Sequence, residues 1–489
     1  MQHQSLAVAH ARSSARALFL ACAPLLLATL ASAPARAQAP SAAAAPSAAV
    51  TPPSWATALD SAIASEMART LTPGAQIAVV VDGRLAYSRG YGVADMETGR
   101  AVTERTLFRV GSVTKMVTAA ALTQLAADGK LDLQAPISTY VPELAGKRVG
   151  AVTTHQLLTH SAGWLDNAVA YGRMGEGALG EVMREVNDTL FFTEPGRVIS
   201  YSNPGYSMAG YVGEMAAKQR FGATVDQLVL RNMGMPRATF RPLEAMTQDF
   251  SQGHVGQPAN PGALVRPFTE NTAQWAAGFL FASAGELARF TMAIMDGGML
   301  DGRRVLAEDA VRRMTTGHQA MPGSTTSRYG YGLSIASTDG RRVWQHGGSI
   351  NGFDAQVTMF PDQKLAVIVL DNRSGAPMQG LTDLVAGLAA GIAPAKPPVL
   401  PDEREATAAE RARLVGTYKQ GATTIRVFEE GGTLNVQQGI LNAPARLVGD
   451  ERLVIVPPQG AKITLLLVRG ADGRVEYLHQ SLRALARQP

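Results

Sequence analysis

The chain has 489 residues, of which 46% are hydrophobic and 17% charged, and its formal net charge at pH 7 is +5. This composition is that of a globular protein long enough for two or three domains. No run of lysine and arginine with interleaved aromatic residues occurs, so nucleic acid is not indicated as a partner.

Residues 1–37 have the pattern of an export signal. Arg12 and Arg16 precede an apolar core from Leu18 to Leu30, and Ala35-Arg36-Ala37 has the small-x-small form of a cleavage site. The apolar core is short and rich in alanine for a membrane span. We therefore expect an exported, periplasmic or secreted protein with no stable membrane span in the mature chain; an uncleaved anchor is the alternative.

Cys22, the only cysteine, lies inside this apolar core. Lipoprotein cleavage before Cys22 is an alternative to cleavage after Ala37, although so early a cut would leave almost no apolar core. Cleavage after Ala37 leaves a mature chain without cysteine, whose stability must come from core burial rather than disulfides. It also removes three arginines and no acidic residue, which lowers the formal net charge from +5 to +2.

A flexible Ala/Pro-rich linker is expected at residues 38–54. A helix from Trp55 then leads into a predicted hairpin, in which strands Gln76–Val81 and Leu85–Tyr91 flank the turn Asp82-Gly83. A helix from Ser112 to Asp128 follows, with its apolar residues on one stripe.

The middle of the chain is mostly helical by pattern. Thr153-x-x-Gln156 and Ser283-x-x-Glu286 read as capping boxes that open helices. Strands return afterwards, and a last apolar helix follows them; the expected ranges are Tyr329–Ser337, Arg342–Gln345, Phe353–Phe360 and Lys364–Leu370 for the strands and Leu381–Ile392 for the helix. This order predicts an α+β domain at 55–393, in which one antiparallel sheet is completed by both chain ends, flanked by helices and interrupted by an inserted helical region.

The tail is predicted to be a separate small domain. A proline-rich linker is expected at 394–404, and residues 405–489 open with a short charged helix around Arg404–Leu414. Short strands separated by glycines follow, which indicates a small all-β barrel or sandwich; they are Thr424–Glu429, Thr433–Gln437, Leu453–Val456, Ile463–Val468 and Val475–Leu478.

Ser112-Val113-Thr114-Lys115 is the most informative short motif. A hydroxyl and an amine three residues apart on a helix share one face, so the lysine amine can reach the serine oxygen. An amine freed of its proton can accept the hydroxyl's proton and make the serine nucleophilic. Alone, the motif is weak, and a serine N-cap on a solvated helix face is the more common explanation of it.

Two further segments strengthen this interpretation. In Tyr201-Ser202-Asn203, a phenol can relay a proton, and an amide can hold a lysine and a substrate carbonyl together. In Gln345-His346-Gly347-Gly348-Ser349, at the end of a predicted strand, the glycines let substrate lie close and a following N–H can face an oxyanion. His346 would add a donor or a cation near neutral pH. Each segment alone could be an ordinary turn.

A fourth segment, Leu157 to Trp164, has the helix-then-loop composition of a possible cleft wall. We expect His160 to be structural and hydrogen-bonded rather than catalytic. Trp164, Trp275 and Trp344 are expected mainly in the core.

Three of these segments, Ser112-Val113-Thr114-Lys115, Tyr201-Ser202-Asn203 and His346-Gly347-Gly348, carry a resemblance to a known family. Their order and spacing resemble those of the signature motifs of the penicillin-recognising serine hydrolases, the superfamily of class C β-lactamases and serine D-peptidases. The resemblance covers about residues 55–393 and implies a β-lactamase/transpeptidase-like fold. It implies that Ser112 is the acylated nucleophile and that Lys115 and Tyr201 handle protons, with the first proton acceptor left open between those two.

The resemblance further implies a substrate-binding role for Asn203 and for the strand His346-Gly347-Gly348, with the backbone N–H groups of Ser112 and Ser349 as an oxyanion hole. It implies no metal and no cofactor. β-Lactamases of this type usually carry lysine at the position of His346, so a titrating residue replaces a permanent cation, which disfavours efficient antibiotic hydrolysis.

The leading hypothesis is an exported serine hydrolase that cleaves amide or ester bonds through an acyl-enzyme at Ser112. The expected substrates are small or D-amino-acid-containing peptides. A carboxylesterase or β-lactamase with the same machinery is the close alternative, and a binding protein that captures wall fragments or penicillin without turnover is the alternative from another class. The expected partner is a small-molecule or peptide substrate. Oligomerisation through the tail domain stays open.

Overall fold

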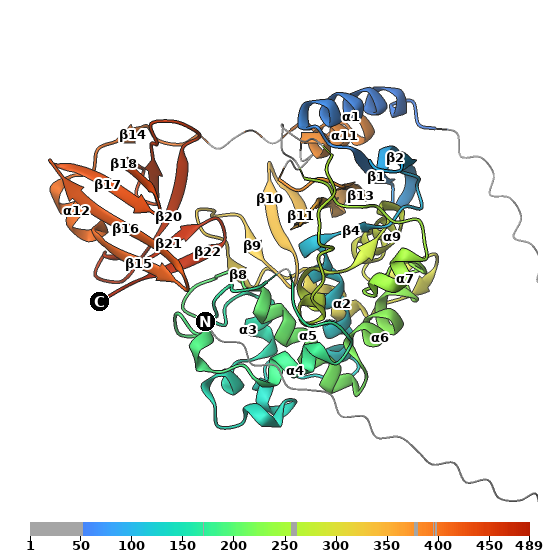
Figure 1. Ribbon diagram of the computed structural model, residues 1–489, viewed down its shortest axis with the longest axis horizontal. Coiled ribbons are helices and arrows are strands. Elements are labelled where there is room, and N and C mark those ends of the chain that lie inside the picture. The colour runs from blue at the N-terminus through green and yellow to red at the C-terminus, as the bar shows by residue number, and fades with distance from the viewer. Residues whose placement is uncertain (1–51, 170, 256–261, 376–379, 395, 397–398) are drawn as a thin grey trace, which may run out of the picture. The chain divides into compact units, whose positions relative to one another are not determined.

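The computed structural model describes residues 52–489 except 170, 256–261, 376–379, 395 and 397–398 (Figure 1). The expected export signal and residues 38–51 of the following linker therefore lie outside the described residues, as do three positions of the linker expected at 394–404. Within the described ranges, no helix combines the length and the apolarity that crossing a membrane requires.

A nine-stranded antiparallel sheet organises the first part of the chain, in the order β3-β2-β1-β13-β12-β11-β10-β9-β8. Its strands are β1 Gly74–Val81, β2 Arg84–Asp95, β3 Arg100–Ala101, β8 Gln319–Ala320, β9 Arg328–Tyr329, β10 Ser334–Thr338, β11 Arg341–Ile350, β12 Phe353–Phe360 and β13 Leu365–Asp371. Two short pairs lie outside this sheet, β4 Phe108–Arg109 with β5 Phe281–Ala282 and β6 Met299–Leu300 with β7 Arg303–Arg304.

The two ends of this part complete one sheet, as the order of elements predicted. β1 pairs with β13, with Ala75 opposite Asp371 (Figure 1). The predicted turn Asp82-Gly83 joins β1 to β2, and both residues have positive φ, the backbone that a type I′ hairpin turn requires.

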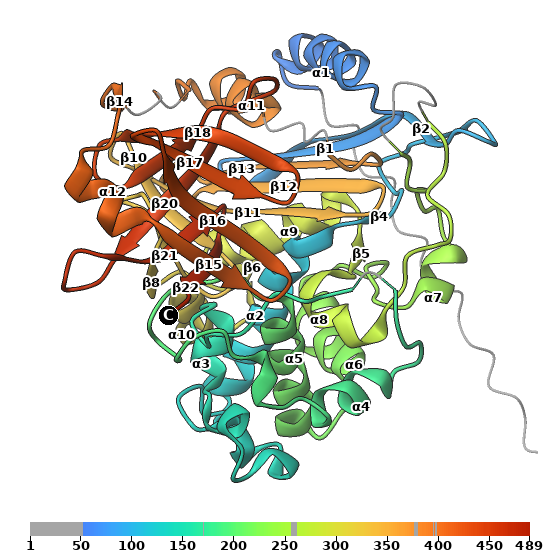
Figure 2. The same ribbon diagram turned by 60° about the vertical axis from the view of Figure 1, so that its left-hand side comes forward.

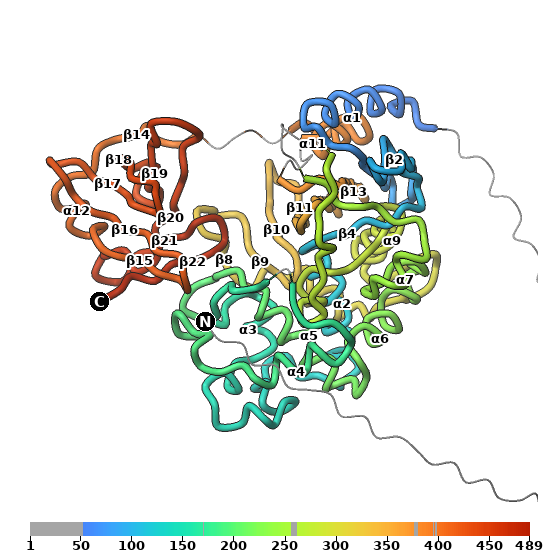
Figure 3. Tube along the Cα trace, viewed as in Figure 1, coloured from blue at the N-terminus to red at the C-terminus, as the bar shows by residue number. Residues whose placement is uncertain are grey.

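Helices cover both faces of the sheet. They are α1 Ala56–Thr70, α2 Thr114–Ala127, α3 Thr154–Leu158, α4 Ala178–Arg184, α5 Asn203–Ala217, α6 Phe221–Val225, α7 Pro242–Met246, α8 Trp275–Gly278, α9 Ala284–Met295, α10 Glu308–Met314 and α11 Gly380–Ala390. Figure 2 shows α1 and α11 on one face and α2 and α9 on the other. Figure 3 traces the inserted helical region from α3 to α6. The larger apolar core lies between the sheet and this inserted region.

The capping boxes predicted at Thr153 and Ser283 are both present and open α3 and α9. The strand expected at 329–337 is divided into β9 and β10. The strand expected at 342–345 is longer, because β11 continues to Ile350 and pairs with β12 along its length. The segment His346 to Ser349, expected at the end of a strand, therefore lies well inside β11.

The tail forms a closed antiparallel barrel, which decides between the barrel and the sandwich. Eight strands pair in sequence from β15 to β22, and pairing of β15 with β22 closes the ring. The elements are β14 Glu403–Arg404, α12 Ala408–Leu414, β15 Gly416–Gln420, β16 Thr423–Glu430, β17 Thr433–Gln438, β18 Leu441–Val448, β19 Arg452–Ile455, β20 Ile463–Arg469, β21 Val475–Gln480 and β22 Arg483–Arg487. Buried aliphatic side chains fill the interior. Sequence periodicity missed β15, β18 and β22.

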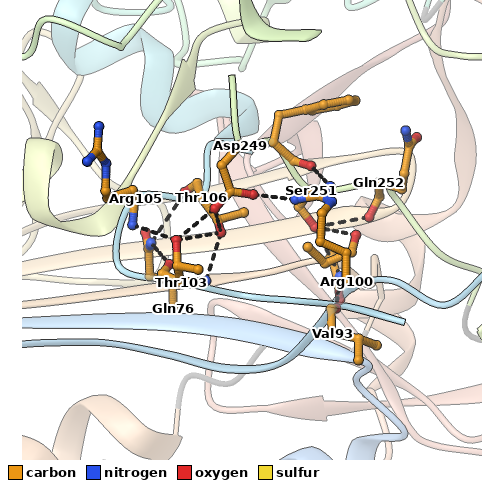
Figure 4. A network of polar contacts seen from close by, with 12 residues as sticks. Gln76, Val93, Arg100, Thr103, Arg105, Thr106, Asp249, Ser251 and Gln252 are labelled. Atoms are coloured by element: carbon orange, nitrogen blue, oxygen red, sulfur yellow. Dashed lines mark hydrogen bonds and ion pairs between the residues drawn. The ribbon is translucent and has the colours of Figure 1, made fainter. Parts of the chain in front are cut away.

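A polar network anchors the chain just before Ser112 (Figure 4). The Asp249 carboxylate accepts hydrogen bonds from the Thr103 and Thr106 hydroxyls, each at 2.7 Å, and forms an ion pair with Arg100. The N–H of Ser251 donates to the carbonyl of Leu107 at 2.8 Å. These contacts fix the segment that leads through β4 into the Ser112 turn.

Candidate active site

Ser112 lies in a 3-10 turn, Gly111–Val113, directly before α2, and its side chain is half-buried. Gly111 has φ of +50°, and a Cβ there would stand 2.6 Å from the backbone nitrogen of Ser349. Both features require glycine at this position. The turn can therefore lie directly against β11, which brings the serine to that strand.

Lys115 points from the first turn of α2 into a fully buried site. Its Nζ lies 3.1 Å from Ser112 Oγ, 2.6 Å from Asn203 Oδ1 and 2.6 Å from the carbonyl oxygen of Ala277. Burial lowers the pKa of Lys115 to about 7, a shift that the charge of Asp166 partly opposes. A neutral amine is therefore well populated at neutral pH.

The neighbours of Lys115 dictate how a neutral amine would be oriented. The Asn203 amide oxygen and the Ala277 carbonyl can only accept, so they take both N–H groups of an NH₂. The amine lone pair is then left for the hydroxyl of Ser112. This arrangement suits proton transfer from serine to lysine.

Tyr201 is brought from far along the chain to the same point. The Lys115 Nζ lies 4.7 Å from the centre of its ring. Burial raises the pKa of Tyr201 above its ordinary value, although a hydrogen bond with Ser112 acts in the opposite direction. The phenol therefore stays protonated at neutral pH.

His160 supports Tyr201 from behind. The two rings lie 4.2 Å apart, and Nδ1 of His160 accepts the backbone N–H of Ser202 at 3.1 Å. These contacts agree with the expected structural, hydrogen-bonded role of His160. The segment Leu157 to Trp164 does not line the cleft, contrary to the expectation of a cleft wall, because its large side chains are buried in the helical core. Trp275 and Trp344 are likewise core residues.

Asn203 begins α5 and is oriented by Asp166. The Asp166 Oδ1 accepts from the backbone N–H of Asn203 at 3.0 Å and from its Nδ2 at 3.1 Å, which turns Oδ1 of Asn203 toward Lys115. The other Asp166 oxygen accepts from Arg483, with Nε at 2.7 Å and Nη2 at 2.5 Å. The Asp166 side chain is only 5% exposed, so its carboxylate is largely shielded from water, whereas the Arg483 side chain is 46% exposed.

Arg483 comes from the barrel and reaches the catalytic cleft. Its guanidinium lies 5.4 Å from the centre of the Tyr201 ring, and the backbone N–H of Tyr201 donates to the carbonyl of Leu482 at 2.8 Å. The Ser200 hydroxyl accepts from the Gln420 side chain at 2.8 Å and from the N–H of Ala484 at 3.1 Å. The barrel thus contributes directly to the surroundings of the tyrosine.

β11 forms the wall opposite α5. A Cβ on Gly348 would lie 2.1 Å from the carbonyl oxygen of Val110 and 2.8 Å from the backbone nitrogen of Ser112. Only glycine therefore allows the strand to approach the serine turn so closely. β10 pairs with β11 as far as Gln345, so the segment from His346 onward has no paired strand on that edge among the described residues.

His346 is neutral at physiological pH, so of the two expected roles, a hydrogen-bond donor or a cation, the cation is ruled out. Burial lowers its pKa to about 4, and the nearby Lys115 adds to the shift. The carbonyl of Gly347 lies 2.6 Å from Nδ1 and can only accept, so Nδ1 carries the proton. The Tyr329 hydroxyl then donates to Nε2 at 3.1 Å.

A single cleft of about 840 Å³ joins these parts. Ser112, Tyr201, Asn203 and the whole segment from His346 to Ser349 line it. Every residue predicted for the site is thus in or beside this cleft, with Lys115 buried beneath it. Nowhere in the described residues do three or more His, Cys, Asp or Glu side chains gather as a metal site.

Sequence reasoning missed Asp166, Tyr329 and Arg483. Asp166 follows the noted Trp164 segment by two residues, so an acidic residue there was the available signal. Arg483 had no local signal, since it belongs to a barrel strand that periodicity did not detect. Its place in the site depends on how the barrel packs.

Comparison with known proteins identifies the class. The model of the Beta-lactamase family matches residues 59–391, and the chain belongs to this family. The protein is accordingly a serine hydrolase, with the acyl-enzyme mechanism that characterises the family.

Two relatives and one solved structure illustrate the range of this family. A D-aminopeptidase of Gluconobacter oxydans (strain 621H) is 27% identical over 403 residues, covering 81% of this chain and 72% of that protein. Esterase EstB of Burkholderia gladioli is 34% identical over 42% of this chain and 56% of its own. The crystal structure of SurE matches with a TM-score of 0.74 and 27% identity, covering 88% of this chain and 98% of that one.

Proposed function

We propose that this protein is an exported peptidase or amidase that cleaves small peptides containing D-amino acids through an acyl-enzyme at Ser112. The observation that carries the proposal is the position of the Lys115 amine, 3.1 Å from Ser112 Oγ, with both its N–H groups directed to acceptors. Similarity to a D-aminopeptidase and to SurE, which has also been crystallised with D-Leu, supports the D-amino-acid assignment.

In the proposed reaction, Ser112 Oγ attacks the carbonyl carbon while its proton passes to the neutral Lys115 amine. The N–H groups of Ser112 and Ser349 stabilise the oxyanion that forms. Tyr201, a protonated phenol, donates to the leaving nitrogen as the C–N bond breaks. Return of a proton from Lys115 to Tyr201 restores both groups, and water then hydrolyses the ester of Ser112.

This assignment selects Lys115 over Tyr201 as the first proton acceptor. The pKa of Lys115 is lowered to about 7, whereas burial raises the pKa of Tyr201. At neutral pH the amine is therefore the available base and the phenol the available acid.

The position of Arg483 favours a substrate that carries a carboxylate. Its side chain is 46% exposed and lines the cleft, whereas His346 is neutral. A carboxylesterase is the second candidate, favoured by the identity of 34% to esterase EstB. The neutral His346 disfavours β-lactams, for which the family's usual lysine would supply a cation.

The test is turnover by the purified mature chain on D-alanyl peptides, nitrophenyl esters and a chromogenic cephalosporin, with Ser112→Ala as the control. We expect peptides to be preferred and Ser112→Ala to lose about 10⁶-fold in turnover. A preference above tenfold for the ester or the cephalosporin would reassign the substrate. A stable adduct of Ser112 with no product release would instead favour a binding protein.

Export is part of the proposal and has its own test. The basic start, apolar core and Ala35-Arg36-Ala37 pattern of residues 1–37 support cleavage after Ala37. Amino-terminal sequencing of the protein recovered from the periplasm or medium should begin at Gln38. Recovery of the uncleaved chain from the membrane fraction would contradict this expectation.

A further inference from the structure

The catalytic cleft continues well beyond Ser112, over one face of the sheet. Side chains alternate along a strand, and Trp344 and His346 of β11 face the helical side, where Trp344 joins the core beneath α2. Gln345 and Val343 therefore face the opposite side, where Val343 packs at the edge of the second core beneath α1 and α11. Both residues line the same cleft as Ser112.

Three neighbouring strands contribute to this second face. Ser334 lies opposite Gln345 and Thr338 lies opposite Arg341, so each of these pairs shares a face. All four residues line the cleft, as do Gln356 and Thr358 of β12. We call this surface the outer groove; it consists of the cleft-lining residues of β10, β11 and β12 on the face away from α2.

The outer groove is long enough for several residues of an extended chain. Arg341 and Ser349 both line the cleft and are eight steps apart on β11. At about 3.3 Å per residue, the separation is about 26 Å, the length of seven to eight extended residues. A volume of about 840 Å³ also lies at the upper end of the range for small-molecule sites. A dipeptide would leave most of it empty.

The chemistry of the outer groove suits a peptide backbone. The Gln356 amide nitrogen donates to Thr358 Oγ1 at 3.1 Å and lies 3.4 Å from Gln345 Oε1, so amides and a hydroxyl form a continuous row. Such groups both donate and accept hydrogen bonds, as peptide groups do. Arg341 of the groove and Asp383 of α11, which lines the same cleft, carry opposite charges, so the groove selects no charge as a whole.

We propose that the outer groove binds the part of a peptide substrate that lies beyond the residues next to the scissile bond, an inference that rests on the proposed function. The protein then acts best on peptides of about five to eight residues rather than on dipeptides. The occupant is the substrate chain itself, because the groove is continuous with the catalytic serine.

The test compares kcat/KM for peptides of two to eight residues around one scissile bond, extended on the amino side in one series and on the carboxyl side in another. We expect kcat/KM to rise at least tenfold with length in one series, which also identifies the direction of binding. Equal kcat/KM at every length in both series would overturn the proposal.

Thr338→Trp is designed to block the far end of the outer groove, and Gln437→Trp is its control. Thr338 lies at the far end of the groove, partly exposed and in a strand, where an aromatic residue is well tolerated. We expect a loss of at least fivefold for peptides of seven and eight residues and no change for dipeptides. Gln437→Trp, at an exposed position of the barrel outside the cleft, should change neither. An equal loss of kcat/KM for peptides of all lengths in Thr338→Trp would contradict the proposed role of the outer groove.

A second readout separates this proposal from the proposed function. Absence of turnover on every peptide would contradict the peptidase assignment. The groove would then be tested by protection of Ser112 from a fluorophosphonate. An eight-residue peptide should slow labelling more than a dipeptide in the unmodified protein but not in Thr338→Trp; equal protection by both peptides would overturn the groove.

Discussion

Asp166 and Arg483, which are 317 residues apart in the chain, form an ion pair at the edge of the catalytic cleft. One carboxylate oxygen of Asp166 receives Nε and Nη2 of Arg483, while the other receives two N–H groups of Asn203. Since Asn203 Oδ1 accepts from Lys115, one carboxylate connects the barrel to the amine next to the nucleophile.

We predict that Asp166→Ala lowers kcat/KM by about 10- to 100-fold, because charge-assisted hydrogen bonds that orient Asn203 are worth about 1.5–3 kcal/mol. Arg483→Ala should cost less, since its side chain is 46% exposed. A double-mutant cycle measures their coupling, which we expect to be about 0.5–3 kcal/mol. Strictly additive losses would contradict a coupled pair.

The rate should rise with pH through about 7. Lys115 acts as a base only when unprotonated, and its pKa is lowered to about 7, so the active form increases from pH 6 to pH 8. Measurement of kcat/KM between pH 5 and 9 should show an ascending limb centred near 7. A profile that falls over this interval would exclude Lys115 as the base. Denaturation at each pH provides the control for loss of structure.

Gly348→Ala should reduce kcat by about 10²- to 10³-fold, the loss typical of a damaged oxyanion site. The added Cβ would meet the carbonyl of Val110 at 2.1 Å and push β11 away from Ser112. Gly380→Ala is the control, because a Cβ there has no described atom within 4 Å. It should leave kcat unchanged. Equal kcat in the two variants would show that the close approach of β11 is not required.

Tyr329→Phe should destabilise the fold by about 1–3 kcal/mol, since Nε2 of the buried His346 would lose its hydrogen-bond donor. Urea denaturation measures this change in the free energy of unfolding. Tyr171→Phe, at a position 44% exposed, should have a much smaller effect. If both variants unfold at the same urea concentration as the unmodified protein, Tyr329 does not hold His346 in the proposed way.

Much of the fold could be predicted because local chemistry agreed with tertiary structure. The turn Asp82-Gly83 and the capping boxes at Thr153 and Ser283 are short-range features, and each has the predicted form. The strands β15, β18 and β22 were missed because residue pattern alone did not mark them, and closure of the barrel depends on a pairing between β15 and β22, which lie far apart in the sequence.

For the site, the sequence by itself determined the chemical groups. A serine and a lysine three residues apart, a tyrosine before an asparagine and two adjacent glycines are local facts, and they sufficed to predict acyl transfer. Folding brings these groups together in or beside one cleft, and the prediction of acyl transfer depended on this proximity.

Only the tertiary structure decided the protonation states and the role of the barrel. Complete burial lowers the pKa of Lys115 to about 7 and keeps His346 neutral, because removal from water disfavours charge. Arg483 reaches Asp166 only because the barrel packs beside Tyr201. Burial and contact between distant segments are properties of the packed chain, and no spacing of residues encodes them.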